Sequence, residues 1–290
     1  MTTKAISAKD ISELRARTGA GMMDCKAALE EAAGDMDRAV EILRAKGITK
    51  AEQRGGRTAS QGLVVIASHQ AGQDVAMIEL DCETDFVART EEFIALAREL
   101  GVHASRNAPL GAHPGAALDA QPLRDKTVGQ VVKELSGKTG EAMALKRVAR
   151  FQQSAGTVQS YLHHNGQVGA LVELEGPAGE PLVELGRELA LHIASASPLA
   201  VSEADLPTET LERERRIATE QVAAEGKPEN IRAKIIEGKI RKFLAENTLL
   251  GQPFVKDDKR SAGDLVKEAA KALGGPVSVK RFARFKVGEA

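Results

Sequence analysis

Apolar positions near the N-terminus recur at helical spacing, in three short runs that glycines separate. The pattern predicts helices over residues 7–17, 23–33 and 35–46. The first run begins with Ser-Ala-Lys-Asp, a helix cap, and the other two stop at Gly34 and Gly47. We therefore predict a three-helix domain over residues 1–48, followed at 49–61 by a basic, Gly-rich linker.

Runs rich in β-branched residues then occur twice, each time as a pair around a Gly-containing turn. They cover 63–68 and 75–82 in one half, and 157–162 and 167–175 in the other. Helical patterns follow at 91–104 and 127–135, and again at 181–194 and 261–273. Each half closes on a strand that contains Lys-Arg-x-Ala-Arg-Phe. The fold class expected is α+β, with a duplicated β-β-α-α-β core of small antiparallel sheets and helices on one face of each.

Matching residues set the register of this duplication. Equivalent positions lie 94, 89 and 134 residues apart in successive segments, as in Gly62 and Gly156, His103 and His192, and Lys146 and Lys280. The first copy therefore has 5 extra residues around Phe86, and the second has 45 more between matched elements. We assign residues 62–151 to the first copy, and 156–205 with a C-terminal helix-strand module at 251–290 to the second. The insertion at 206–250 contains two helical patterns and reads as a projecting hairpin.

Composition and charge narrow the class of protein. Among 290 residues, 40 Lys plus Arg balance 41 Asp plus Glu, and aromatic residues make up 3%, so direct nucleic-acid binding is not expected. The two cysteines, Cys25 and Cys82, lie in different modules, which favours free thiols in a reducing compartment. Neither a secretory h-region nor an apolar run of about 18 residues is seen, so we expect a cytoplasmic protein without membrane contact.

Acidic residues gather after the second strand of the first copy. An Asp-x-Glu-x-Asp motif from Asp81, with Glu92 at its twelfth position, superficially resembles a calcium loop, but Phe86 stands where that loop needs glycine. A hydrolase could use the same carboxylates with His163 or His164. No phosphate loop, nucleophile elbow or Cys/His metal spacing accompanies them, so we predict no catalytic residue, no metal and no cofactor.

Three apolar side chains lie in polar surroundings. Phe86 falls within the residues that only the first copy has, and it either contacts another molecule or packs with Val87 and Phe93 as a cap on the sheet. Met22 and Met23 follow a glycine between two helices, where methionines either fill a small core or form an adaptable contact surface.

Two further patterns have structural and functional interpretations. The basic closing strands at 146–150 and 280–284 interleave charge with Phe, which suits RNA contact or simple alternation on a half-exposed strand. His103 and His192 occupy matched positions in the two copies, which favours a shared structural role over catalysis.

The sixteen residues from Leu14, LRARTGAGMMDCKAAL, together with Thr-Asp-Phe-Val at 84–87, resemble the elongation factor Ts family, guanine nucleotide exchange factors of elongation factor Tu. The resemblance runs over essentially the whole chain, including Gly-Gln-Pro-Phe-Val at 251–255. It implies a ubiquitin-associated-like N-terminal domain, a duplicated core and a helical hairpin. It also implies a role in translation elongation and binding of elongation factor Tu with or without GDP. The sequence leaves the oligomeric state open, with a homodimer and a dimer of heterodimers as alternatives.

The resemblance also implies roles for individual residues. Such a factor performs no covalent chemistry; it binds the nucleotide-free GTPase more tightly, and by linkage weakens the binding of GDP and magnesium. Phe86 would be an apolar wedge near the magnesium site, Asp85 a competing polar group, and the rest of the loop a frame that holds them. The implied partner-binding residues are Thr84, Asp85, Phe86 and Val87 in the loop, and Leu14, Met22, Met23, His163 and Leu265 elsewhere. The chain departs from the family at Asp81, where Asn is expected in many members, and this adds a negative charge beside the loop.

Overall fold

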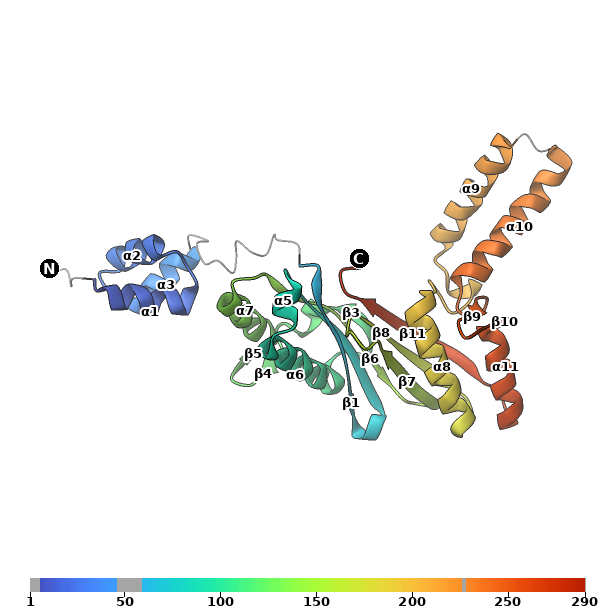
Figure 1. Ribbon diagram of the computed structural model, residues 1–290, viewed down its shortest axis with the longest axis horizontal. Helices are drawn as coiled ribbons and strands as arrows, with labels where there is room; N and C mark the ends of the chain where they lie inside the picture. Colours follow the sequence, from blue (N-terminus) through green and yellow to red (C-terminus); the bar gives the residue numbers. More distant parts are fainter. Residues whose placement is uncertain (1–5, 46–58, 226–227, 290) are drawn as a thin grey trace.

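The computed structural model describes residues 6–45, 59–225 and 228–289. Helices and small antiparallel sheets make up the chain, which confirms the predicted α+β class (Figure 1). The linker predicted at 49–61 lies mostly outside the described residues, although Gln61 already belongs to the first strand.

Three short helices form the N-terminal domain, as predicted. They are α1 (Ala8–Thr18), α2 (Met22–Glu31) and α3 (Met36–Ala45). The Ser7 hydroxyl accepts a hydrogen bond from the Asp10 amide, and the Asp10 carboxylate accepts one from the Ser7 amide, so the expected cap is present. Gly19 ends α1 at φ 65°, a left-handed conformation that suits glycine. Leu14 and Leu29 are fully buried in the single apolar core that these helices share.

The first sheet is antiparallel, with strand order β1-β2-β6-β3. Its strands are β1 (Gln61–His69), β2 (Asp74–Cys82), β6 (Met143–Gln152) and β3 (Gly111–Pro114), and the 3-10 turn η1 (Gln70–Gly72) joins the first two. The prediction missed β3, because four residues ending in proline give too short an alternation to identify an edge strand. The two central strands, β2 and β6, are both strands that the sequence pattern predicts.

Helices cover one face of this sheet. They are α6 (Glu91–Asn107) and α7 (Val128–Thr139), and the short elements η2 (Gly115–Leu118), β4 (Pro122–Leu123) and β5 (Lys126–Thr127) connect them. The central strand β2 is buried along its whole length. Ala76, Ile78 and Leu80 pack against the helices, where Phe93 and Leu100 are fully buried. The alternate residues of β2 point to the opposite face.

The second copy repeats this arrangement around a sheet of strand order β7-β8-β11. Its strands are β7 (Gly156–Leu162), β8 (Val168–Glu175) and β11 (Ser278–Lys286); its helices are α8 (Glu180–Ala196) and α11 (Ala262–Leu273), with β9 (Pro253–Phe254) and β10 (Asp257–Ser261) before the last helix. The order β7-β8-β11 corresponds to β1-β2-β6, so the predicted duplication is present in the structure.

The two sheets pack face to face, with their helices on the outer faces (Figure 1). Val75 and Met77 of the first sheet share an apolar cluster with Leu171 and Phe285 of the second. A Cβ at Gly169 would lie 2.8 Å from a Val64 methyl group and 2.9 Å from the Met77 sulfur, so glycine allows the sheets to approach closely there. The core is thus a layered helix-sheet-sheet-helix structure.

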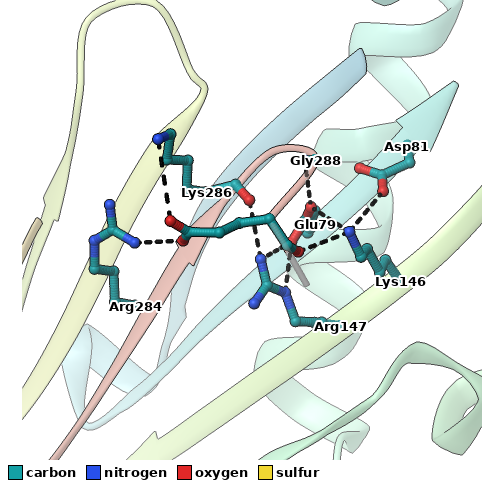
Figure 2. A network of polar contacts seen from close by, with 8 residues as sticks. Glu79, Asp81, Lys146, Arg147, Arg284, Lys286 and Gly288 are labelled. Atoms are coloured by element: carbon teal, nitrogen blue, oxygen red, sulfur yellow. Dashed lines mark hydrogen bonds and ion pairs between the residues drawn. The ribbon is translucent and has the colours of Figure 1, made fainter. Parts of the chain in front are cut away.

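Buried ion pairs lie between the sheets. The Arg147 Nε donates to the Glu79 carboxylate at 2.6 Å, and its guanidinium carbon lies 4.7 Å from the ring centre of Phe285 in the other copy. Figure 2 shows the Gly288 amide donating to the same carboxylate, at 3.2 Å, with the Lys146 ammonium 3.6 Å away. The C-terminal segment is therefore tied to the first sheet.

The second copy has the equivalent cluster. The Arg281 Nε donates to Glu173 at 2.7 Å, and its guanidinium carbon lies 4.4 Å from the ring centre of Phe151 in the first copy. Lys280 Nζ is 3.1 Å from the same carboxylate. Each copy thus places an arginine over a phenylalanine of the other. These contacts give the basic closing strands a structural role and weaken the RNA alternative.

The matched histidines also have matched partners, in keeping with the structural role predicted for them. His103 Nε2 lies 2.8 Å from the Gln121 side-chain oxygen, and His192 Nε2 lies 3.1 Å from that of Gln252. The Val255 amide donates to His192 Nδ1, so the proton of this ring is on Nε2, which donates to the glutamine. Burial lowers the pKa of His192, which keeps it neutral.

The insertion in the second copy is the predicted helical hairpin. After η3 (Glu203–Asp205), it consists of α9 (Thr208–Ala224) and α10 (Glu229–Asn247), which project away from the sheets (Figure 1). The ends of the hairpin meet, since the Leu249 amide donates to the Ala200 carbonyl at 2.8 Å and Leu250 to Val201 at 3.0 Å. Leu249 is fully buried in the second helix-sheet core.

Candidate functional site

The residues that only the first copy has form one helical turn, α5 (Asp85–Ala88), between β2 and α6. A loop was expected here, but Thr84 initiates a helix: its Oγ1 accepts a hydrogen bond from the Val87 amide at 3.3 Å. Phe86 is 81% exposed. This exposure contradicts the alternative in which Phe86 packs with Phe93 as a cap on the sheet.

Both sides of this turn are held by the body of the protein. Val87 is partly buried and packs against the first helix-sheet core. The Thr90 amide donates to the Val87 carbonyl at 3.0 Å, and Thr90 in turn caps α6. Asp85 forms an ion pair with Arg89 at 2.9 Å; the Arg89 side chain is largely exposed and that of Asp85 is about half exposed, so this pair adds little stability. The turn therefore presents an exposed Phe86 on an anchored base.

Thr84 is tied to the turn between α7 and β6, a contact that the sequence did not suggest. The Thr84 amide donates to Glu141 Oε2 at 3.0 Å, and its hydroxyl donates to Glu141 Oε1 at 2.6 Å. In the opposite direction, the Ala142 amide donates to the Glu83 carboxylate at 2.7 Å. The Cys82 thiol donates to the Thr84 carbonyl at 3.2 Å, and burial raises the pKa of this thiol to about 12.

Asp81 lies near the end of β2, a few residues before this turn, and it is buried. Figure 2 shows its carboxylate next to the Lys146 ammonium, 3.6 Å away. One oxygen, Oδ1, has no hydrogen-bond partner. Burial, with the nearby charge of Glu79, raises the pKa of Asp81 to about 7, and Lys146 offsets only part of this effect.

The residues expected in the N-terminal domain differ in exposure. Met22 and Met23, at the start of α2, are 60% and 74% exposed, as an apolar contact surface requires. Leu14 is fully buried between the helices, so the expectation that it contacts a partner does not fit its position. α1 turns Leu14 toward the apolar core that the three helices share.

His163 and Leu265 occupy two different parts of the second copy. His163 is partly buried in the turn between β7 and β8, where its Nδ1 lies 3.0 Å from the Tyr161 hydroxyl. This turn rests on the first copy, because the Val64 amide of β1 donates to the Gly166 carbonyl at 2.7 Å. Leu265 lies on α11, partly buried against the second core. The structure thus brings the His163 turn to the sheet that carries α5, and places Leu265 on an outer helix.

Two negative findings concern the part of the chain that the structure describes. No group of three or more His, Cys, Asp or Glu is placed there to hold a metal ion. No described helix combines the length and the apolar character needed to cross a membrane.

Comparison with known proteins gives consistent matches. A family model described as "Elongation factor TS" matches residues 83–289. A protein of Clostridium perfringens (strain SM101 / Type A) named Elongation factor Ts is 43% identical over 286 residues. The match covers 98% of this chain and 93% of the length of that protein. Proteins with the same name from Aquifex aeolicus (strain VF5) and Prosthecochloris aestuarii (strain DSM 271 / SK 413) are 43% and 40% identical, covering 98% of this chain and 98% and 99% of their own.

These matches, on a fold of the expected class, define a translation elongation factor that acts in protein biosynthesis. The family model covers more than half of the chain, and relatives at 40% identity or more span nearly all of it. The chain belongs to the elongation factor Ts family.

Proposed function

We propose that this protein binds elongation factor Tu and promotes the release of GDP by displacing Mg²⁺ from the GTPase, without catalytic residues of its own. The observation that carries the proposal is Phe86, a large apolar side chain 81% exposed on an anchored helical turn. The hydration of an exposed phenylalanine is unfavourable, and this cost is removed only when a partner covers the ring. Its neighbour Asp85 would place a carboxylate at the same point of contact.

The size of the effect requires more than one contact. A thousandfold acceleration of GDP release corresponds to about 4 kcal/mol of barrier. Full burial of one phenylalanine supplies about 1.5–3 kcal/mol. Since binding and release are linked, the remaining free energy must come from contacts that are stronger with the nucleotide-free GTPase. We propose Met22, Met23, His163 and Leu265 for these contacts, with Thr84 and Val87 as the frame of the α5 turn.

Release of a fluorescent GDP from purified elongation factor Tu tests the proposal. The chain at catalytic amounts should raise the release rate many-fold, and excess free Mg²⁺ should oppose it. The matched control is the same chain heated past its unfolding transition, which removes the site and leaves the composition unchanged. A release rate equal to that of elongation factor Tu alone would rule the proposed function out.

A further inference from the structure

The α5 turn is too short to hold its own shape. It has four residues, Asp85–Ala88, whereas isolated helices of fewer than about 12 residues are marginal in water. The hydrogen bond from the Val87 amide to the Thr84 hydroxyl is one of the few bonds that define the turn. The direction in which the Phe86 side chain points from the surface therefore depends on the contacts that hold Thr84.

Glu141 holds Thr84 through both carboxylate oxygens. One oxygen accepts from the Thr84 amide at 3.0 Å, and the other from its hydroxyl at 2.6 Å. The hydroxyl that donates to Glu141 is the same group that accepts from Val87, so the carboxylate fixes the orientation of the helix cap. Hydrogen bonds to an ionised acceptor are roughly twice as strong as neutral ones. Glu141 is 57 residues away in sequence.

The second copy shows what the same fold does without this contact. By the register of the closing strands, the residue equivalent to Glu141 is Gly275, and both follow a left-handed glycine that ends a helix, Gly140 or Gly274. A Cβ at Gly275 would lie 2.7 Å from the Pro177 ring, so the short connection of the second copy leaves no room for a side chain there. The glutamate and the extra turn therefore occur together in one copy and are both absent from the other.

We propose that Glu141 is a positioning residue for the α5 turn: its carboxylate fixes Thr84, and Thr84 fixes the orientation of Phe86. The effect of Glu141 on GDP release rests on the proposed function, whereas its effect on the shape of the turn does not. Glu141 acts through Thr84, so it need not touch the GTPase itself. Glu83 and Ala142 form a second bond between the same two segments, which keeps them adjacent when Glu141 is altered.

Amide hydrogen exchange of the free protein tests the first half of the proposal. Glu141→Gln keeps the size of the side chain but leaves one of the two acceptors, so the Val87 and Ala88 amides should exchange roughly tenfold faster, the scale of one lost hydrogen bond. Thr84→Val should have a similar effect, and Thr84→Ser, which keeps the hydroxyl, should retain the protection. Glu134→Gln is the control, because Glu134 lies on α7 and its carboxylate pairs with Lys126 of β5 instead of with Thr84. Unchanged exchange in Glu141→Gln would overturn the proposal.

GDP release by the same full-length variants tests the second half. Glu141→Gln and Thr84→Val should each slow release roughly tenfold, and the double variant should be no slower than either, because both break one chain of contacts. If the two effects multiply instead, Glu141 contributes on its own and the positioning role is wrong. If the wild-type chain has no effect on GDP release, the proposed function fails, and the hydrogen exchange result still decides whether Glu141 positions the turn.

Discussion

The two copies of the core share three sheet strands, their covering helices and their buried polar contacts, and they differ in the connections between these elements. Both have a buried glutamate paired with an arginine that lies over a phenylalanine of the other copy. Both have a histidine bonded to a glutamine. The first copy alone has α5 and the edge strand β3, and the second alone has the α9–α10 hairpin.

This difference distinguishes contacts that stabilise the fold from segments that the fold does not need. A contact present in both copies serves what the copies have in common, which is a sheet packed on helices and on the other sheet. A segment present in one copy is not needed for that packing, since the other copy folds without it. The most exposed phenylalanine side chain of the described residues, Phe86, lies in such a segment. The comparison therefore supports the proposal that α5 contacts a partner, and it indicates that the ion pairs serve the fold.

The largest effect is expected from breaking a shared contact. Arg147→Met keeps an unbranched apolar stem but leaves the buried Glu79 without its closest cation, which should lower the free energy of unfolding by about 3–5 kcal/mol. Arg281→Met should cost less, because Lys280 lies 3.1 Å from Glu173 whereas Lys146 lies 3.6 Å from Glu79. Urea unfolding of both variants measures the difference. Equal stability of Arg147→Met and the wild type would show that the shared ion pair does not hold the sheets.

An unshared residue should show the opposite behaviour. Phe86→Ala should slow GDP release by up to about 3 kcal/mol of barrier, roughly two decades of rate, and leave the melting temperature nearly unchanged. Phe93→Ala is the matched control: Phe93 is fully buried, and its loss should cost about 3–5 kcal/mol of stability. Melting and GDP release measured on both variants decide the assignment. Release at the wild-type rate by Phe86→Ala would leave Met22, Met23 and His163 as the leading contacts.

A smaller, pH-dependent effect is expected at Asp81. Its pKa of about 7 in the folded protein lies above the ordinary 3.8, so the folded state binds this proton more tightly than the unfolded state. The contribution to stability is fully present below about pH 4 and is lost as the pH rises through about 7. Asp81→Asn removes the buried charge, and should be more stable than the wild type by about 1–3 kcal/mol at pH 8.

The same comparison at low pH provides the control for Asp81. The stability advantage of Asp81→Asn should shrink toward zero as the pH falls to about 4, since the wild-type carboxyl is then neutral as well. Thermal unfolding across this range measures the difference between the two proteins. An advantage that stays constant with pH would show that packing, and not the charge, separates them.

The smallest effect is expected from removing the unshared hairpin. Replacement of residues 208–245 by a short Gly-Ser linker should change the free energy of unfolding by about 1 kcal/mol or less, because the ends of the hairpin already meet. Replacement of the whole predicted insertion, 206–250, should cost about 2–5 kcal/mol more, because it also removes Leu249 from the second core. Melting followed by circular dichroism compares the two. Loss of cooperative folding in the shorter replacement would mean that the hairpin is part of the core.

Much of the fold could be predicted because its signals are local. Helix caps such as Ser7, glycine stops, and runs of β-branched residues fix most elements to within a few residues, and the repeat fixes which strands correspond. The same repeat marked Thr84 to Val87 as the segment without an equivalent. Local patterns did not predict β3, because an edge strand of four residues depends on pairing with β6.

The sequence by itself determined the class of the fold, the duplication and the position of the unmatched segment, since each depends on spacing along the chain. Only the tertiary structure decided that Asp81 is buried beside Lys146 and that Thr84 starts a helix fixed by Glu141. These outcomes depend on residues that are far apart in sequence and become neighbours only when the sheets and helices pack. Burial, pKa and the orientation of a side chain follow from those neighbours, and no periodicity along the chain encodes them.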